Sequence, residues 1–134
     1  MFNLGGKIEY IGHKNREEIN KLYGQSICGL CVLQPASNYI NSQPIKMYEY
    51  MAAGLPYICS DFPVWRKLTE SIGAGIVINS KNPEELSRAV NCLLNHLKKA
   101  EGMGRKGRNA VINNFTWEAE SLKLQKLYEG FTEV

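Results

Sequence analysis

The sequence lacks the long apolar runs and the metal-ligand clusters that mark two large classes of protein. Its apolar runs are far shorter than the roughly 20 residues that a membrane-spanning helix needs, and its first residues lack the pattern of a secretory signal. The two histidines, His13 and His96, form no ligand-spaced cluster with the four cysteines. The net charge of +3 is too small to indicate nucleic-acid binding. We therefore expect a cytoplasmic protein without a bound metal or other cofactor.

The cysteines suggest a metal or redox pair at one place, Cys28 and Cys31. Both belong to the continuous apolar run 27–33, which is typical of a strand buried on both faces of a parallel sheet. Residues three apart on a strand point to opposite faces, so these two thiols cannot share a metal ion or a disulfide. We expect all four cysteines to be buried and reduced.

Positive charge gathers in one segment near the C-terminus. The residues are Lys98, Lys99, Arg105, Lys106 and Arg108. A solvated helix end and loop is the simplest explanation, and weak attraction to an anionic lipid surface or to the rest of a larger enzyme is the alternative. The sequence thus allows at most peripheral contact with a membrane, at its inner face.

Strands and helices are predicted to alternate along the chain. The expected strands are 7–11, 27–33, 57–60 and 75–78. The first expected helix begins at Asn15 with a capping box. The others are expected over 45–53, over 64–72, from Asn82 to about 99, over 103–113, and over 116–134 as the terminal helix. This order predicts a single α/β domain over 1–134, with a Rossmann-like parallel sheet flanked by helices. Ligands bind such sheets outside the carboxyl ends of the strands.

The segment 42–56 stands out because its short helix is apolar nearly all round apart from Lys46 and Glu49. Such a helix is expected to be buried, and charges on it need a partner or a ligand. The N-terminus of this helix, at Ser42 and Gln43, can bind a phosphate, and Lys46 adds a positive charge there. Glu49 can accept hydrogen bonds from two ribose hydroxyls. From the spacing alone, an ion pair between Lys46 and Glu49 is an equally good interpretation.

The run from Lys46 to Pro56 resembles the K-x-x-E-Y-M-A-x-G-x-P signature of GT-B-type glycosyltransferases. The match is to the large retaining group that uses nucleotide-activated sugars (family 4). Four further segments resemble blocks of that family in the same order, namely 8–12, 28–35, 75–86 and 115–118. The resemblance covers nearly the whole chain. It implies the C-terminal, donor-binding half of such an enzyme, with Glu49 on the ribose hydroxyls of a nucleotide-sugar.

The same resemblance assigns weaker positions and shows departures. Asn41 stands where the family has the first glutamate of its Glu–seven residues–Glu motif, and Ser42-Gln43-Pro44 replaces the usual Gly-Phe-Gly amides. Pro44 has no N–H to donate, so this loop offers the sugar one backbone donor fewer than the family's loop does. Lys46 matches a lysine of many relatives. The resemblance implies that it supports this loop or binds the phosphates. His13 and Lys14 follow the strand whose loop borders the nucleobase, although an exposed loop is the simpler account.

The family's donor half has six strands in the order 3-2-1-4-5-6, and the four strands predicted here match the third to the sixth. We therefore expect half of a GT-B architecture, truncated at its N-terminus and inactive alone, with no catalytic residue in this chain. The gap in the sheet would be closed by direct re-pairing of the first strand or by a second copy, or the chain is a fragment. Among these we predict self-association as a homo-oligomer.

The function that the resemblance implies is polysaccharide biosynthesis. A sugar would pass from the nucleotide donor to a glycan or lipid-linked acceptor, which a missing N-terminal domain binds. A non-catalytic nucleotide-binding module and a bare interaction domain with a Rossmann-like sheet remain the alternatives.

Overall fold

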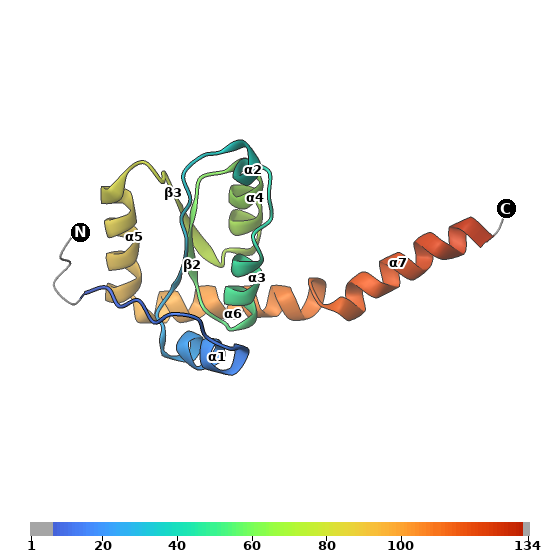
Figure 1. Ribbon diagram of the computed structural model, residues 1–134, viewed down its shortest axis with the longest axis horizontal. Helices are drawn as coiled ribbons and strands as arrows, with labels where there is room; N and C mark the ends of the chain where they lie inside the picture. The colour runs from blue at the N-terminus through green and yellow to red at the C-terminus, as the bar shows by residue number, and fades with distance from the viewer. Residues whose placement is uncertain (1–6, 133–134) are drawn as a thin grey trace.

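A computed structural model of the protein describes residues 7–132 (Figure 1). Three parallel strands, β1 (Gly29–Cys31), β2 (Tyr57–Ser60) and β3 (Gly75–Ile78), form one sheet in that order. The helices are α1 (Arg16–Gln25), α2 (Ser37–Ile40), α3 (Ile45–Ala52), α4 (Pro63–Ile72), α5 (Pro83–Asn95), α6 (Leu97–Asn114) and α7 (Trp117–Thr132). The predicted α/β fold with a parallel sheet flanked by helices is confirmed.

The sheet is covered on both faces because the side chains of its central strand β2 alternate between two apolar cores. Tyr57 and Cys59 pack into the core formed with α3 and α4. Ile58 packs into the core formed with α5 and the first turn of α6. Figure 1 shows α5 on one side of the sheet and α3 with α4 on the other. Cys31 belongs to the first core and Cys28 borders the second, which confirms that these two thiols lie on opposite faces.

Three helix starts form as their sequences predict. The side chain of Asn15 accepts a hydrogen bond from the Glu18 amide, and the Glu18 carboxylate accepts one from the Asn15 amide. The side chain of Asn82 accepts from the first-turn amides of α5, and Thr116 Oγ1 accepts from the Ala119 amide before α7. These caps satisfy N–H groups that have no partner within the helix, so each fixes where its helix begins.

The predicted strand at 7–11 is wrong. This segment has no regular structure, and Ile8 and Tyr10 are 69% and 93% exposed. A strand needs a neighbour for its N–H and C=O groups. Within the described residues, β1 pairs with β2 alone, and the segment 7–11 does not join its open edge. Re-pairing of the first strand, one of the expected ways to close the sheet, therefore does not occur.

Other boundaries also differ from the prediction. β1 covers three residues of the run 27–33, and the loop at 36–43 contains the short helix α2. The helix that begins at Asn82 ends at Asn95, because His96 leaves the helical conformation at φ −132° and ψ 62°. Lys98 and Lys99 consequently lie in the first turn of α6, which starts six residues earlier than the predicted 103. The apolar spacing continues through Leu97 and conceals this break.

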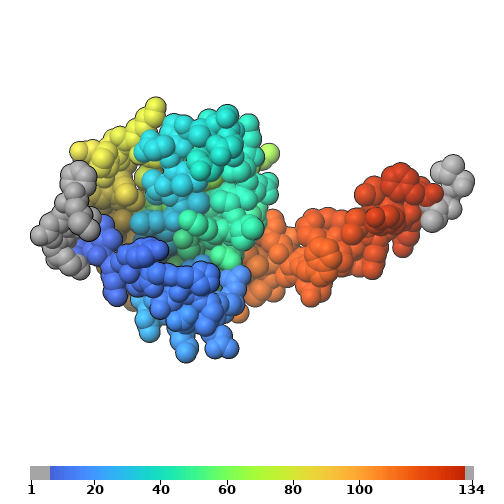
Figure 2. All heavy atoms as spheres, in the orientation of Figure 1, coloured from blue at the N-terminus to red at the C-terminus, as the bar shows by residue number. Residues whose placement is uncertain are grey.

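The last helix projects away from the rest of the molecule (Figures 1 and 2). Its predicted apolar stripe faces solvent, and the residues of that stripe are Leu124, Leu127, Tyr128 and Phe131. Among the described helices, α7 included, none is long and apolar enough to cross a membrane. That residues 1–134 form a single domain stays a prediction.

Candidate functional site

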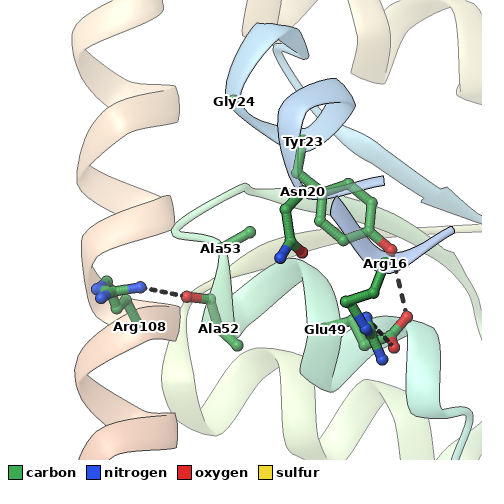
Figure 3. A pocket seen from close by; sticks show the side chains of 8 residues that line it. All are labelled: Arg16, Asn20, Tyr23, Gly24, Glu49, Ala52, Ala53 and Arg108. Carbon is green, nitrogen blue, oxygen red and sulfur yellow. Dashed lines mark hydrogen bonds and ion pairs between the residues drawn. The ribbon is translucent and has the colours of Figure 1, made fainter. Parts of the chain in front are cut away.

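Glu49 lies on the side of α3 that faces α1, and its side chain is 27% exposed. Oε1 lies 2.8 Å from an Arg16 guanidinium nitrogen, and Oε2 accepts a hydrogen bond of 3.2 Å from the Tyr23 hydroxyl (Figure 3). The charge on this largely apolar helix thus has partners, as a charge on a partly buried helix needs. The described structure pairs Glu49 with Arg16, not with Lys46, so the interpretation as an ion pair within α3 is wrong.

Helix α1 presents these partners because Arg16 and Tyr23 are seven residues apart and share one helix face. The capping box at Asn15 sets the start of the helix. The Tyr23 ring then contacts the Tyr50 ring edge to face, with centroids 5.6 Å apart, which holds α1 against α3. Burial, and then the neighbouring charge of Glu49, raise the pKa of Tyr23. The phenol therefore stays protonated and donates to Glu49.

A cavity of about 510 Å³ opens beside the Glu49 carboxylate, between α1, α3 and α6. Its lining residues, all drawn in Figure 3, are Arg16, Asn20, Tyr23, Gly24, Glu49, Ala52, Ala53 and Arg108. Arg108 reaches across from α6 and donates to the Ala52 carbonyl at the end of α3. The cavity therefore combines one carboxylate with two guanidinium groups, an amide and a phenol.

The residues predicted at the start of the helix lie elsewhere. Ser42 Oγ donates to the Tyr39 carbonyl, and the Ser42 carbonyl accepts a 2.6 Å bond from Trp65 Nε1 on α4. Gln43 Oε1 accepts from the Tyr48 hydroxyl at 3.1 Å. Asn41 and Lys46 are exposed. These four residues sit toward the carboxyl end of β1, and the structure does not bring them into the cavity beside Glu49.

His13 and Lys14 precede α1 and also stay outside the cavity lining. His13 is exposed, and Lys14 Nζ lies 3.2 Å from Glu18 Oε1 one turn further on. Sequence reasoning missed Arg16, Asn20 and Tyr23 as the neighbours of Glu49. Their spacing of four and then three residues places them on one face of the capped helix, which is the signal that could have identified them.

The cavity has the chemistry of a site for a hydroxylated anion. A carboxylate can accept hydrogen bonds from two adjacent hydroxyls, and guanidinium groups bind phosphates in a planar, bidentate way. Over residues 7–132, no group of three or more His, Cys, Asp and Glu side chains is arranged to hold a metal ion. Burial raises the pKa of the Cys59 thiol to about 11, so this thiol is neutral at physiological pH and packs as a small apolar group.

One protein family and two known proteins are similar to this chain. The sequence profile of the family described as glycosyl transferases group 1 matches residues 2–110. Spore coat protein SA of Bacillus subtilis (strain 168) is 28% identical over 123 residues, which are 91% of this chain and 32% of that protein. Sucrose-phosphate synthase of Thermosynechococcus elongatus superposes with a TM-score of 0.80 at 24% identity, over 98% of this chain and 32% of that one. The chain thus spans about a third of the length of both proteins.

Proposed function

Because this chain belongs to the glycosyl transferases group 1 family, we propose that it is the donor-binding part of a glycosyltransferase. The single observation that carries the proposal is the Glu49 carboxylate, half-buried beside a cavity of about 510 Å³ that holds two guanidinium groups. In this proposal Glu49 accepts hydrogen bonds from the ribose hydroxyls of a nucleotide-sugar. The GT-B resemblance found in the sequence, which the family match and the fold confirm, supports that role.

The contacts of Glu49 suit exchange with a ligand. The Arg16 side chain is 66% exposed. An ion pair that is so open to water contributes about 1 kcal/mol or less to stability. Ribose hydroxyls can therefore take the place of the guanidinium at little cost in free energy. The released Arg16 guanidinium then remains beside Glu49 and can pair with a negative charge of the donor.

The remaining predicted residues belong to the outer parts of the proposed site. We assign Asn41, Ser42, Gln43 and Lys46, at the carboxyl end of β1, to the phosphate and sugar side of the donor. His13 and Lys14, just before α1, are assigned to the nucleobase side. These assignments follow from the sequence resemblance and from the position of each segment relative to Glu49.

The whole reaction is proposed to need residues outside this chain. The chain covers 32% of each relative, and sugar transfer in a GT-B enzyme takes place between two halves. We propose that the other half supplies the acceptor, a glycan or a lipid-linked sugar, and that the isolated chain binds donor without transferring sugar. The reaction is placed in the cytoplasm, with at most peripheral membrane contact through the basic residues of α6.

The proposal is tested by calorimetric titration of the chain with nucleoside diphosphate-sugars whose base is uracil, guanine or adenine. We expect one base class to bind the chain, and Glu49→Gln to weaken that binding roughly tenfold or more through loss of charged hydrogen bonds. Glu101→Gln is the matched control, since it removes the same charge from an exposed site, where Glu101 lies 3.9 Å from Arg105 and does not line the cavity beside Glu49. Absence of binding by every nucleotide, or equal loss in both variants, would overturn the proposal.

Titration with the matching nucleoside diphosphate separates the two classes of function. A donor site binds the nucleotide-sugar at least as tightly as the diphosphate alone. A plain nucleotide-binding module prefers the diphosphate, and an interaction domain binds neither.

A further inference from the structure

We propose that a second hollow, at the carboxyl ends of the strands, binds a neutral saccharide unit. The hollow measures about 380 Å³, within the usual range for small-molecule sites, and shares no lining residue with the cavity beside Glu49. The lining residues that matter are Ile40, Asp61, Phe62, Pro63, Asn79 and Lys81. The inference concerns a separate site and does not depend on the donor role of Glu49.

The hollow is built by the loops that follow all three strands. Asp61 comes directly after β2, and Asn79 comes directly after β3. The Gln34 side chain, beyond β1, donates a 2.9 Å bond to the Ser80 carbonyl, and the Asp61 amide donates a 2.8 Å bond to the Ile78 carbonyl. These bonds hold the loops together before any ligand arrives. The carboxyl end of a parallel sheet is also where α/β folds bind their ligands.

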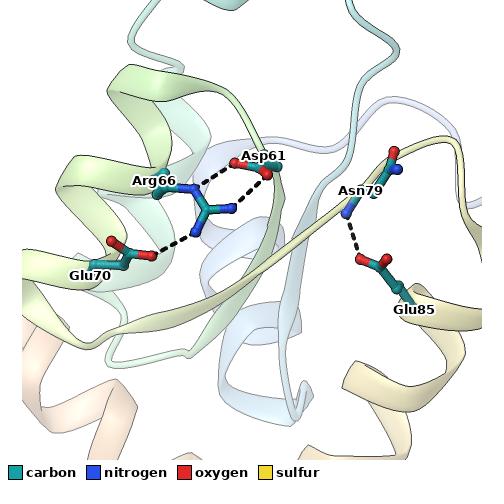
Figure 4. A network of polar contacts seen from close by, with 5 residues as sticks. All are labelled: Asp61, Arg66, Glu70, Asn79 and Glu85. Carbon is teal, nitrogen blue, oxygen red and sulfur yellow. Dashed lines mark hydrogen bonds and ion pairs between the residues drawn. The ribbon is translucent and has the colours of Figure 1, made fainter.

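The Asp61 carboxylate is fixed in place at this edge. Both of its oxygens accept hydrogen bonds from Arg66, at 2.7 and 2.6 Å, and a third Arg66 nitrogen donates to Glu70 at 2.9 Å (Figure 4). The side chain of Asp61 is 41% exposed, and each carboxylate oxygen retains a lone pair that can accept from a hydroxyl. The Arg66 hydrogen bonds lower the pKa of Asp61, so this acceptor is ionised at neutral pH.

Hydrogen-bond donors and an apolar wall complete the hollow. Asn79 Oδ1 accepts from the Lys81 amide, and the Asn79 amide donates to Glu85 (Figure 4), so the side-chain NH₂ of Asn79 is the group that can serve a ligand. Lys81 adds an ammonium donor. Phe62, buried against Trp65 with ring centroids 4.7 Å apart, forms the apolar wall with Ile40 and Pro63.

This combination fits a sugar ring better than a phosphate. A pyranose offers an apolar C–H face together with hydroxyls that both donate and accept, which match the apolar wall, the carboxylate, the amide and the ammonium. A phosphate would meet the charge of Asp61, while the Arg66 guanidinium is already committed to two carboxylates. The lining is close to neutral as a whole, so charge alone gives an anion little attraction.

Backbone amide shifts in an NMR titration test the inference. The probes are the methyl α-glycosides of glucose, galactose and mannose, N-acetylglucosamine, and inorganic phosphate. We expect at least one sugar to shift the amides of Asp61, Asn79 and Lys81 at millimolar concentration while the amides around Glu49 stay unchanged. Sugars that shift none of these amides, or shifts with phosphate alone, would overturn the proposal.

Three variants make the assignment specific. Asp61→Asn is expected to weaken sugar binding roughly tenfold, the cost of losing a charged acceptor. Glu70→Gln is the matched control, because it also removes an Arg66 partner but does not line the hollow, and it should bind sugar as the unmodified chain does. Lys81→Ala leaves the Asp61–Arg66 pair intact and should also weaken binding. Unchanged affinity in both Asp61→Asn and Lys81→Ala would contradict the site.

Discussion

At the residue scale, Glu49 and Cys59 show how position decides what a side chain can do. Glu49 sits at the edge of the core, where its side chain is 27% exposed and its ion pair with Arg16 is open to water. Cys59 and Tyr57 lie on β2 in the interior, where burial raises the pKa of the thiol to about 11 and that of the phenol to about 12. The binding role that we propose for Glu49 needs this exposure, whereas Cys59 and Tyr57 pack in the core.

The pKa shifts of these buried groups predict how stability depends on pH. The ordinary values are 9.0 for the Cys59 thiol and 10.0 for the Tyr57 phenol, and both are raised in the folded chain. The folded state therefore holds these protons more tightly than the unfolded state. Their contribution to stability is complete below about pH 9 and is lost as the pH rises toward 11 and 12.

Urea denaturation at a series of pH values measures this dependence. We expect the free energy of unfolding to be steady from about pH 7 to pH 8.5 and to fall progressively above about pH 9. A free energy that stays constant up to pH 11 would contradict the burial of Cys59 and Tyr57.

At the element scale, α6 is held against the end of α3 by a close backbone approach. A Cβ atom built on Gly104 would lie 1.9 Å from the Gly54 carbonyl oxygen, so the two segments can meet only because residue 104 is glycine. Gly54 has a φ of +71°, a backbone conformation that is strained for any residue with a side chain. It turns the chain from α3 toward β2. The cavity beside Glu49 depends on this contact, since α6 supplies Arg108.

Two alanine substitutions in α6 test that contact. Gly104→Ala is expected to destabilise the fold by about 3 kcal/mol or more, because the clash is with backbone and the helices must separate. Gly102→Ala is the matched control, two residues away in the same helix, where an added Cβ meets only the Arg105 side chain at 3.9 Å. It should stabilise the helix by about 0.5–1 kcal/mol. Equal urea midpoints for the two variants would contradict the packing.

Helices and strands can be predicted from the sequence where the interactions that form them join residues close together in the chain. The starts of α1 and α5 are predictable because Asn15 and Asn82 cap amides only two or three residues away. The segment 7–11 has strand-forming residues, but whether it becomes a strand depends on a neighbour that no local pattern reveals. Glu49 was predicted as the key charge, whereas its partner Arg16 is 33 positions away and emerges only from the packing of α1 on α3.

At the scale of the whole molecule, two exposed surfaces of the described chain are suited to association. One is the open edge of β1, beside which Leu30 is exposed. The other is the apolar stripe of α7, which extends from the body in Figures 1 and 2. Open strand edges and exposed apolar faces favour association, so the self-association expected from the sequence stays a prediction.

Sedimentation velocity at several protein concentrations measures this self-association. We expect the average sedimentation coefficient to rise with concentration, and removal of residues 117–134 to reduce that rise if α7 is the surface involved. A stable monomer over the whole concentration range would contradict the prediction.

The proposed contact between Glu49 and the ribose of a nucleotide-sugar can be measured in one comparison. The donor that binds best and its 2′,3′-dideoxy analogue are titrated into the unmodified chain and into Glu49→Gln. We expect the unmodified chain to prefer the ribose form by roughly tenfold or more, and the variant to lose most of this preference. The same preference in both proteins would show that the hydroxyls are bound elsewhere and that Glu49 does not hold the ribose.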